Sequence, residues 1–134
     1  MKFSTALVAP MLAQGSMAAV AIMASMYAGG TAGLIYEAWY WDGGIVDDFT
    51  NHTPKTSCKL QGSHGSICEI SGYKFTLNSA RKGGCNYSDH IGSATIENYR
   101  GEVIEVNGER CHEIRMCISS SLGGSSTNGY QCDF

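Results

Sequence analysis

The chain has 134 residues and a formal net charge of -3 at pH 7, so it suffices for one domain and lacks the basic excess typical of nucleic-acid-binding proteins. Its hydrophobic share of 43% excludes an intrinsically disordered chain. The 17 glycines and 6 cysteines are high counts for this length, and the cysteines are the more informative of the two.

The N-terminal residues follow the pattern of an export signal. Lys2 is the only charged residue before Glu37, and an apolar stretch begins at Phe3. A positive start, a short apolar stretch and small residues after it define a secretory signal peptide. The alternative is a retained membrane helix, because the uncharged stretch is long enough to span a bilayer. Pro10 and Gly15 interrupt that stretch, which favours the signal peptide.

Two short sequences near the end of this stretch fit the cleavage pattern. Small residues stand in A-x-A-like spacing in Ser16-Met17-Ala18 and again in Ala19-Val20-Ala21. We therefore expect residues 1–21 to be a signal peptide that is cut after Ala18 to Ala21, with a second option near Ala28. The mature protein would be secreted and extracellular, without stable membrane insertion.

The cysteines all follow residue 57, and their even number in an exported chain predicts three disulfides. Their spacing leaves the connectivity open. No C-x-x-C occurs, so neither a zinc ribbon nor a thioredoxin-like site is indicated, and we expect no metal and no cofactor. The cysteines are Cys58, Cys68, Cys85, Cys111, Cys117 and Cys132.

Residues 22–57 form a cysteine-free segment that contains an aromatic run, Leu34–Trp41. As a strand, this run places Trp39 and Trp41 on one face and Tyr40 on the other. These three residues are a candidate surface for stacking a sugar or a partner protein. The alternative, a core or edge strand of the domain, is favoured because aromatic residues are common in strands.

Residues 58–134 form a six-cysteine domain with clear strand patterns. The sequence Ser66–Ile70, Ser71-Gly72 and Tyr73–Leu77 predicts a hairpin, because apolar and polar residues alternate after the turn. Further strands are expected at Ser93–Tyr99 and Glu102–Val106. Asn107-Gly108 comes next, and this pair favours a type I′ hairpin turn between residues 102–106 and the segment that follows.

The segment 110–122 fits two periods. As a strand it places His112, Ile114 and Met116 on one face, whereas as a helix it aligns Cys111, Ile114, Ile118 and Leu122. The Asn-Gly pair favours the strand. The Ser/Gly-rich tail, Ser119–Gly129, predicts a loop. The expected fold is mainly antiparallel β, a small disulfide-stapled β-sandwich-like domain; the alternative is an α+β sandwich with one helix around 110–122.

Two N-glycosylation sequons occur among polar residues, at Asn51-His52-Thr53 and Asn86-Tyr87-Ser88. Both asparagines, Asn51 and Asn86, are therefore candidate glycan carriers in surface loops of an exported protein.

The sequence also contains residues of the types that a small secreted ribonuclease uses. Small secreted ribonucleases cleave RNA with a Glu base, a His acid and an Arg that binds the phosphate. The residues of these types that the sequence places near one expected hairpin are Glu105, Arg110, His112 and Arg115, with His90 and Glu97 nearby. A solvated charged face is the simpler interpretation, since the chain lacks a basic excess for RNA.

The opening Met-Lys-Phe-Ser-Thr-Ala-Leu-Val-Ala and the Gly/Ser-rich six-cysteine domain resemble the small secreted cysteine-rich proteins of filamentous fungi. That class includes plant-pathogen effectors and killer toxins. The resemblance implies a non-enzymatic effector or toxin that binds a host or competitor protein or cell-surface component, with no nucleic-acid partner. The alternatives are a small secreted ribonuclease-like enzyme and a cell-wall glycan-binding module.

Overall fold

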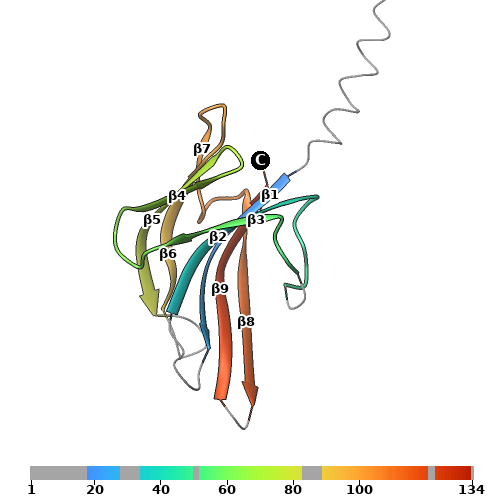
Figure 1. Cartoon of the computed structure of the whole chain (residues 1–134), viewed down its shortest axis with the longest axis vertical. Helices are drawn as coiled ribbons and strands as arrows, with labels where there is room; N and C mark the ends of the chain where they lie inside the picture. The colour runs from blue at the N-terminus through green and yellow to red at the C-terminus, as the bar shows by residue number, and fades with distance from the viewer. Residues whose placement is uncertain (1–17, 28–33, 50–51, 83–88, 121–122, 134) are drawn as a thin grey trace, which may run out of the picture.

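The computed structural model describes residues 18–27, 34–49, 52–82, 89–120 and 123–133. Within these ranges every regular element is a strand, and all pairings are antiparallel (Figure 1). This confirms the mainly antiparallel β fold. The strands are β1 (Ala18–Tyr27), β2 (Leu34–Asp42), β3 (Thr56–Leu60), β4 (Ser66–Ile70), β5 (Tyr73–Lys82), β6 (Asp89–Glu97), β7 (Val103–Glu105), β8 (Cys111–Ser120) and β9 (Gly123–Asp133).

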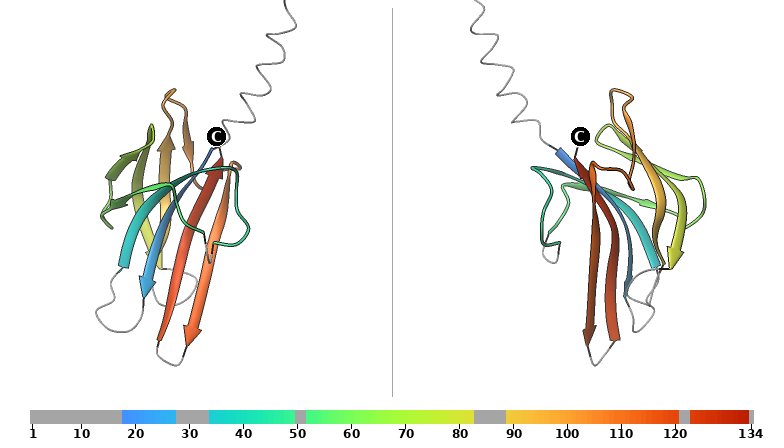
Figure 2. Two further views of the ribbon diagram at one scale, coloured as in Figure 1. Left: turned by 45° about the vertical axis from the view of Figure 1, so that its right-hand side comes forward. Right: turned by 180° about the vertical axis from the view of Figure 1, so that it is seen from behind.

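The strands form two sheets that pack face to face as a sandwich (Figure 2). The five-stranded sheet has the order β3-β2-β1-β9-β8, and the four-stranded sheet has the order β4-β5-β6-β7. An inner core lies between them. Its largest fully buried side chains are Phe75, Ile22, Leu77, Ile91, Ile96, Val20, Val106 and Cys132.

Strand β1 is the central strand of the five-stranded sheet, between β2 and β9. Its residues Ala19 to Ala24 expose 1% of their surface or less. Both faces are buried, because Val20 and Ile22 contact the inner core while Ala21 and Met23 belong to a second cluster on the outer face. The expected signal-peptide boundary between residues 21 and 22 therefore falls inside a buried strand.

Strand β2 alternates as the sequence predicts. Tyr36 and Ala38 are buried in the inner core, and Tyr40 packs against it. Trp39 and Trp41 lie on the outer face with the second cluster. A period of two on a strand with both faces covered explains why nearly every residue of this aromatic run is apolar.

The β4–β5 hairpin is confirmed. Its strands pair from Ser66↔Leu77 to Ile70↔Tyr73. The two turn residues, Ser71 and Gly72, have φ of 53° and 83°, which is the left-handed region that a type I′ turn needs at both central positions.

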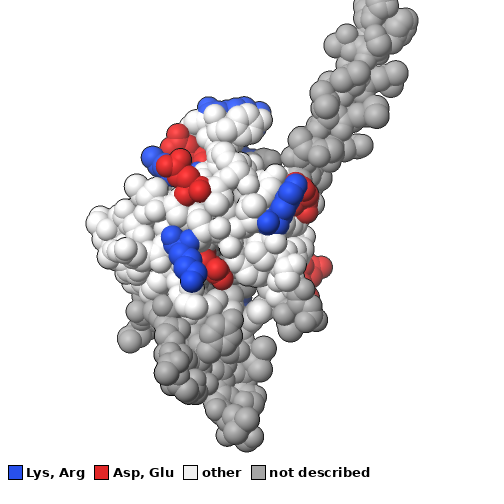
Figure 3. Space-filling view, in the orientation of Figure 1, with Lys and Arg blue, Asp and Glu red and all other residues white. Residues whose placement is uncertain are grey.

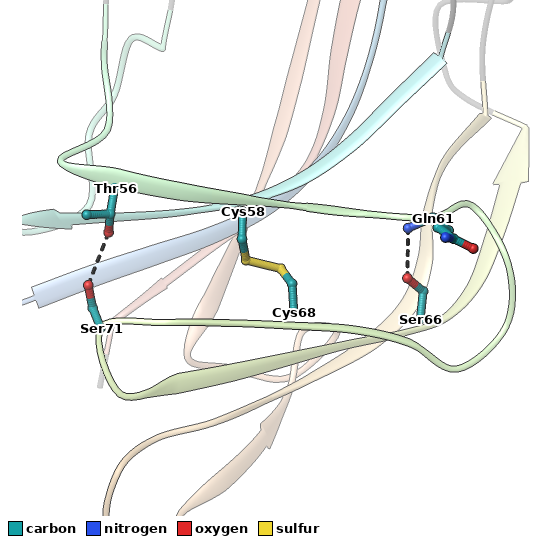
Figure 4. Close-up of a disulfide and its surroundings, with 6 residues drawn as sticks. All are labelled: Thr56, Cys58, Gln61, Ser66, Cys68 and Ser71. Atoms are coloured by element: carbon teal, nitrogen blue, oxygen red, sulfur yellow. Dashed lines mark hydrogen bonds between the residues drawn. A yellow bond between two sulfur atoms is a disulfide. The ribbon is translucent and has the colours of Figure 1, made fainter.

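Two disulfides are defined within the described residues. Cys58–Cys68 joins β3 at the edge of one sheet to β4 at the edge of the other. Figure 4 shows this bond between two hydrogen bonds, Thr56 Oγ1 to Ser71 Oγ at 3.1 Å and Gln61 N to Ser66 Oγ at 2.7 Å. Together they close one side of the sandwich.

The second disulfide, Cys111–Cys132, bridges the paired strands β8 and β9. Cys117 is also disulfide-bonded, and none of the described cysteines is free. Cys85 lies outside the described residues.

The expected Asn107-Gly108 hairpin is wrong. Strand β7 belongs to the four-stranded sheet and β8 to the five-stranded sheet, so the connection crosses between the sheets. Neither residue has a positive φ. The reason lies in Val106, which is 1% exposed and draws the chain into the inner core just before the Asn-Gly pair.

The segment 110–122 contains strand β8 up to Ser120, so the strand interpretation is confirmed and the helical alternative is wrong. The expected loop at Ser119–Gly129 is also wrong, because β9 occupies Gly123–Asp133 and pairs with both β1 and β8. Close packing selects small residues there: a Cβ on Gly129 would lie 2.1 Å from the carbonyl oxygen of Ile22.

Candidate functional site

The outer face of the four-stranded sheet is exposed and carries a regular side-chain pattern. Tyr73, Phe75 and Leu77 turn inward, so their neighbours on β5 turn outward. Pairing across the strands forms two rows, Glu69–Lys74–Glu97–Val103 and Ile67–Thr76–Thr95–Glu105. We call these eight residues, together with Tyr99 and Arg100, the candidate surface.

Apolar side chains on this surface are unusually open to solvent. Tyr99 is 74% exposed, Val103 56% and Ile67 52%, and they are the large hydrophobic residues singled out as exposed among those described. Tyrosine and arginine are enriched in the residues that dominate protein–protein binding. Arg100 adds to this, since its guanidinium carbon lies 5.5 Å from the Tyr99 ring centroid.

Asn98 fixes the turn that carries Tyr99 and Arg100. Its side chain is almost fully buried, and Oδ1 accepts hydrogen bonds from the backbone N–H of Arg100 and of Glu102, each at 3.0 Å. Its Nδ2 donates to Glu102 Oε1 at 3.2 Å. Gly101, with φ of 83°, then reverses the chain into β7. The exposed tip is therefore held by a rigid turn.

Beside the turn lies an open depression of about 290 Å³, lined by Glu69, Gly72, Lys74, Glu97, Asn98 and Tyr99. Among these lining residues, the Lys74 ammonium lies 3.9 Å from the Glu97 carboxylate. Tyr99 packs close to Gly72, where an added Cβ would lie 3.3 Å from Tyr99 Cβ. The β4–β5 and β6–β7 turns thus meet at one end of the candidate surface.

Charges are distributed in small mixed groups. Figure 3 shows acidic and basic side chains next to one another, separated by uncharged surface, in the view of Figure 1. On the candidate surface the acidic residues outnumber the basic ones, because Glu69, Glu97 and Glu105 stand against Lys74 and Arg100. A face of this kind suits a protein partner better than the polyanionic backbone of a nucleic acid.

The structure separates the members of the aromatic run. Trp41 is only 4% exposed, and Trp39 is half-buried beside it. Both belong to an outer aromatic cluster, Trp39, Trp41, Phe49 and His52, in which the Trp41 and His52 ring centroids are 4.7 Å apart. Tyr40 lies on the opposite face against Tyr73. The three residues therefore do not form one open stacking surface.

The segment between β2 and β3 covers the outer face of the five-stranded sheet at this cluster. Gln131 on β9 holds it, because Oε1 accepts from Val46 N at 2.9 Å and Nε2 donates to Val46 O at 2.6 Å. Trp41 Nε1 donates to Gly44 O at 2.9 Å. His52 Nε2 is the buried side-chain nitrogen in the described residues for which no hydrogen-bond partner is found.

An exposed ion pair joins the two ends of the connection between β2 and β3. Lys55 Nζ lies 2.9 Å from Asp42 Oδ2, and Lys55 N donates to Tyr40 O at 2.8 Å. The hydrogen bond and charge of Lys55 lower the pKa of Asp42 and the same contact raises the pKa of Lys55. Burial, followed by the charge of Asp42, raises the pKa of Tyr40.

The residues of the ribonuclease hypothesis do not converge. Glu105 and Arg110 line one open depression of about 370 Å³, but Arg110 pairs with Glu102 at 2.5 Å. Ile104 packs toward the inner core, so Glu105 points outward from the four-stranded sheet. His112 shares the face of Ile114, which packs on the outside of the other sheet. The sandwich therefore lies between the expected base and the expected acid.

The remaining members of that set are also dispersed. Arg115 alternates with Ile114, so it faces away from His112, and it pairs with Glu113 at 3.4 Å. Glu97 belongs to the candidate surface. His90 lies in β6, and nothing of its side chain is described. No group of three potential metal-ligating side chains occurs in the described part of the chain.

Both sequon asparagines, Asn51 and Asn86, lie outside the described residues. Sequence analysis missed Tyr99 and Arg100, which it assigned to a strand end and a connection. A usable signal was the Tyr-Arg-Gly sequence between two strand candidates, because a glycine there indicates a turn and a turn exposes its side chains.

The described ranges contain no helix with the length and apolar character that crossing a membrane requires. Comparisons of the chain with protein-family models, with curated proteins and with solved structures find no match.

Proposed function

We propose that this protein is a secreted cysteine-rich effector or toxin that acts by binding a protein or cell-surface component of a host or competitor, without catalysis of its own. The observation that carries the proposal is the candidate surface, where Tyr99 and Arg100 stand on a turn held by Asn98 and the exposed Val103 lies next along the chain at the start of β7. The fungal resemblance and the disulfides support export to an oxidising compartment.

The composition of the surface supports a protein partner. An exposed aromatic ring and a guanidinium give large contact area, while the neighbouring Thr76 and Thr95 hydroxyls and the Glu69–Lys74–Glu97 row provide polar contacts around them. Apolar anchors with a polar surround are the usual arrangement of a specific interface.

The test uses the full-length gene, expressed so that oxidised protein is recovered from the medium and applied to host or competitor cells. We expect a change in cell viability or immune output. Tyr99→Ala and Arg100→Ala should each weaken the response about tenfold or more, as for interface residues that dominate binding.

Lys59→Ala is the matched control, because Lys59 is an exposed residue on β3 of the other sheet and should act like wild type. Inertness of the wild type across plausible hosts and competitors would overturn the proposal. Equal activity of the Tyr99 and Arg100 variants would instead move the binding surface elsewhere on the molecule.

A further inference from the structure

The buried central strand distinguishes between the cleavage positions that the sequence leaves open. A cut after Ala21 would remove Ala19, Val20 and Ala21, which are all 1% exposed or less. These residues face Trp41, Tyr40 and Trp39 on β2 and Asp133, Cys132 and Gln131 on β9. A cut near Ala28 would remove all of β1. The first product would lose the N-terminal part of the strand between β2 and β9, and the second would lose that strand entirely.

We propose that the export signal is cut at the Ala18–Ala19 bond, which makes Ala19 the first residue of the mature protein. This position keeps every buried residue of β1, because Ala18 is the one residue of the strand start that is partly exposed. It also follows Ser16-Met17-Ala18, which supplies the two small residues that a signal peptidase needs on the N-terminal side of the bond.

The reaction is a hydrolysis carried out by a membrane-bound signal peptidase. The amide bond between the Ala18 carbonyl carbon and the Ala19 nitrogen breaks, and one water molecule is consumed. The oxygen of that water remains in the new carboxylate of Ala18. Both hydrogens of that water end as protons on the Ala19 nitrogen, which becomes an α-ammonium group at neutral pH.

The neighbours of this new cation provide an independent argument. Ala18 pairs with Asp42 on β2, and Ala19 pairs with Asp133 on β9, so a carboxylate side chain stands on each adjacent strand at this end of β1. Lys55 already neutralises Asp42. The half-buried Asp133 is therefore the carboxylate placed to pair with an Ala19 ammonium. A cut three residues later would create the cation at Ile22, opposite Ala38 and Tyr130, where no carboxylate pairs with it.

This inference rests on the export that the proposed function includes. The test is the N-terminal sequence and intact mass of the wild-type protein recovered from culture medium. A start at Ala19 supports it. Secreted protein that starts at Ile22, at Gly29 or at any other residue overturns the cleavage position but leaves export intact. Full-length protein that stays with the cells overturns both, so the two failures are distinguishable.

A pair of variants at Ala18 sharpens the test. Ala18→Leu places a large residue at the cut and should abolish the Ala19 start, whereas the control Ala18→Ser keeps a small residue and should retain it. An unchanged Ala19 start in Ala18→Leu would show that the bond is recognised in another way and would overturn the assignment of Ala18.

The pairing of the Ala19 ammonium with Asp133 can be tested by the reactivity of the α-amino group. Mature protein with Asp133→Asn should react severalfold faster with an amine-reactive reagent at its α-amino group near neutral pH, because an unpaired ammonium loses its proton more easily. Asp47→Asn, in the exposed segment after β2, is the control and should react like wild type. Equal rates for Asp133→Asn and wild type would overturn the proposed pairing.

Discussion

Asn98 holds the exposed tip of the candidate surface from beneath. Replacement by alanine removes three side-chain hydrogen bonds and leaves the N–H groups of Arg100 and Glu102 without their acceptor. We expect Asn98→Ala to lower the free energy of unfolding in urea by about 1–3 kcal/mol. The control is Asn107→Ala, whose exposed side chain makes only a 3.5 Å contact with Gly92 O. Equal stability of the two variants would contradict the assigned role.

Gly129 lets β9 approach β1. A methyl group there would lie 2.1 Å from Ile22 O and 2.8 Å from Met23 Cα, and both are backbone atoms of the central strand. Gly129→Ala should therefore lower the free energy of unfolding by at least the roughly 1–3 kcal/mol of an overpacked core, or prevent recovery of folded protein. Gly108→Ala is the milder comparison, since its added methyl meets only Glu105 O at 3.1 Å. Normal yield and stability of Gly129→Ala would show that the β1–β9 packing is misassigned.

His52 contributes a ring to the outer aromatic cluster and a buried nitrogen that lacks a hydrogen-bond partner. Phenylalanine keeps the ring and removes the desolvated nitrogen. We expect His52→Phe to raise the free energy of unfolding by about 1 kcal/mol. His112→Phe, at an exposed position of β8, should give no such gain and serves as the control. Destabilisation by His52→Phe would mean that the nitrogen has a partner in solution.

Tyr73 makes the stability sensitive to high pH. Burial, followed by the charges of Tyr40 and Tyr99, raises the pKa of Tyr73 above its ordinary 10.0. The folded protein therefore holds this proton to higher pH than the unfolded chain, so the contribution to stability is complete below about pH 10 and is lost as the pH rises through the folded pKa. The urea midpoint should fall as the pH rises above about 10, and Tyr73→Phe should flatten that fall. An identical pH profile in the variant would exclude Tyr73 as its source.

At the scale of elements, the sequence predicted a strand or turn correctly where the requirement on its residues was local. The alternation in β2 and the Ser71-Gly72 turn were predictable, since burial on alternate faces and positive φ are local requirements. The Asn107-Gly108 pair predicted a hairpin wrongly. The path of the chain there is set by the burial of Val106, which depends on the other sheet. Strand β9 was predicted as a loop because it is rich in Ser and Gly. These small residues are required by the close packing of β9 against β1, which no local sequence pattern indicates.

The Cys58–Cys68 disulfide connects the edges of the two sheets. Replacing both cysteines with serine frees a chain segment whose ends are separated by 10 residues, and we expect the free energy of unfolding to fall by about 2–3 kcal/mol. Hydrogen exchange should accelerate first in β3 and β4. Thr56→Ala, which removes only the flanking hydrogen bond to Ser71, should have a much smaller effect. Uniform acceleration over both sheets would show that this bond supports the whole fold rather than one side.

At the scale of the whole molecule, the fold class could be predicted from composition and pattern, but the candidate surface could not. Its members come from four strands and the turn between β6 and β7, and only the pairing register places Glu69, Lys74, Glu97 and Val103 in one row. The residues of the ribonuclease hypothesis do not come together for a related reason. Glu105 and His112 are close in the chain but point out of opposite sides of the sandwich. Closeness in sequence is a poor guide where a connection changes sheets.

The pairing of the first strand with the last one determines the order in which the chain can fold. The β1–β9 ladder joins Val20 to Cys132, so nearly the whole described chain separates these partners. Contacts of such long sequence separation form late and slow the folding of β proteins. During synthesis and translocation, the apolar β1 emerges before β9 and lacks this partner until β9 has been made. Completion of the five-stranded sheet, and closure of the Cys111–Cys132 disulfide beside it, must therefore follow the synthesis and translocation of β9.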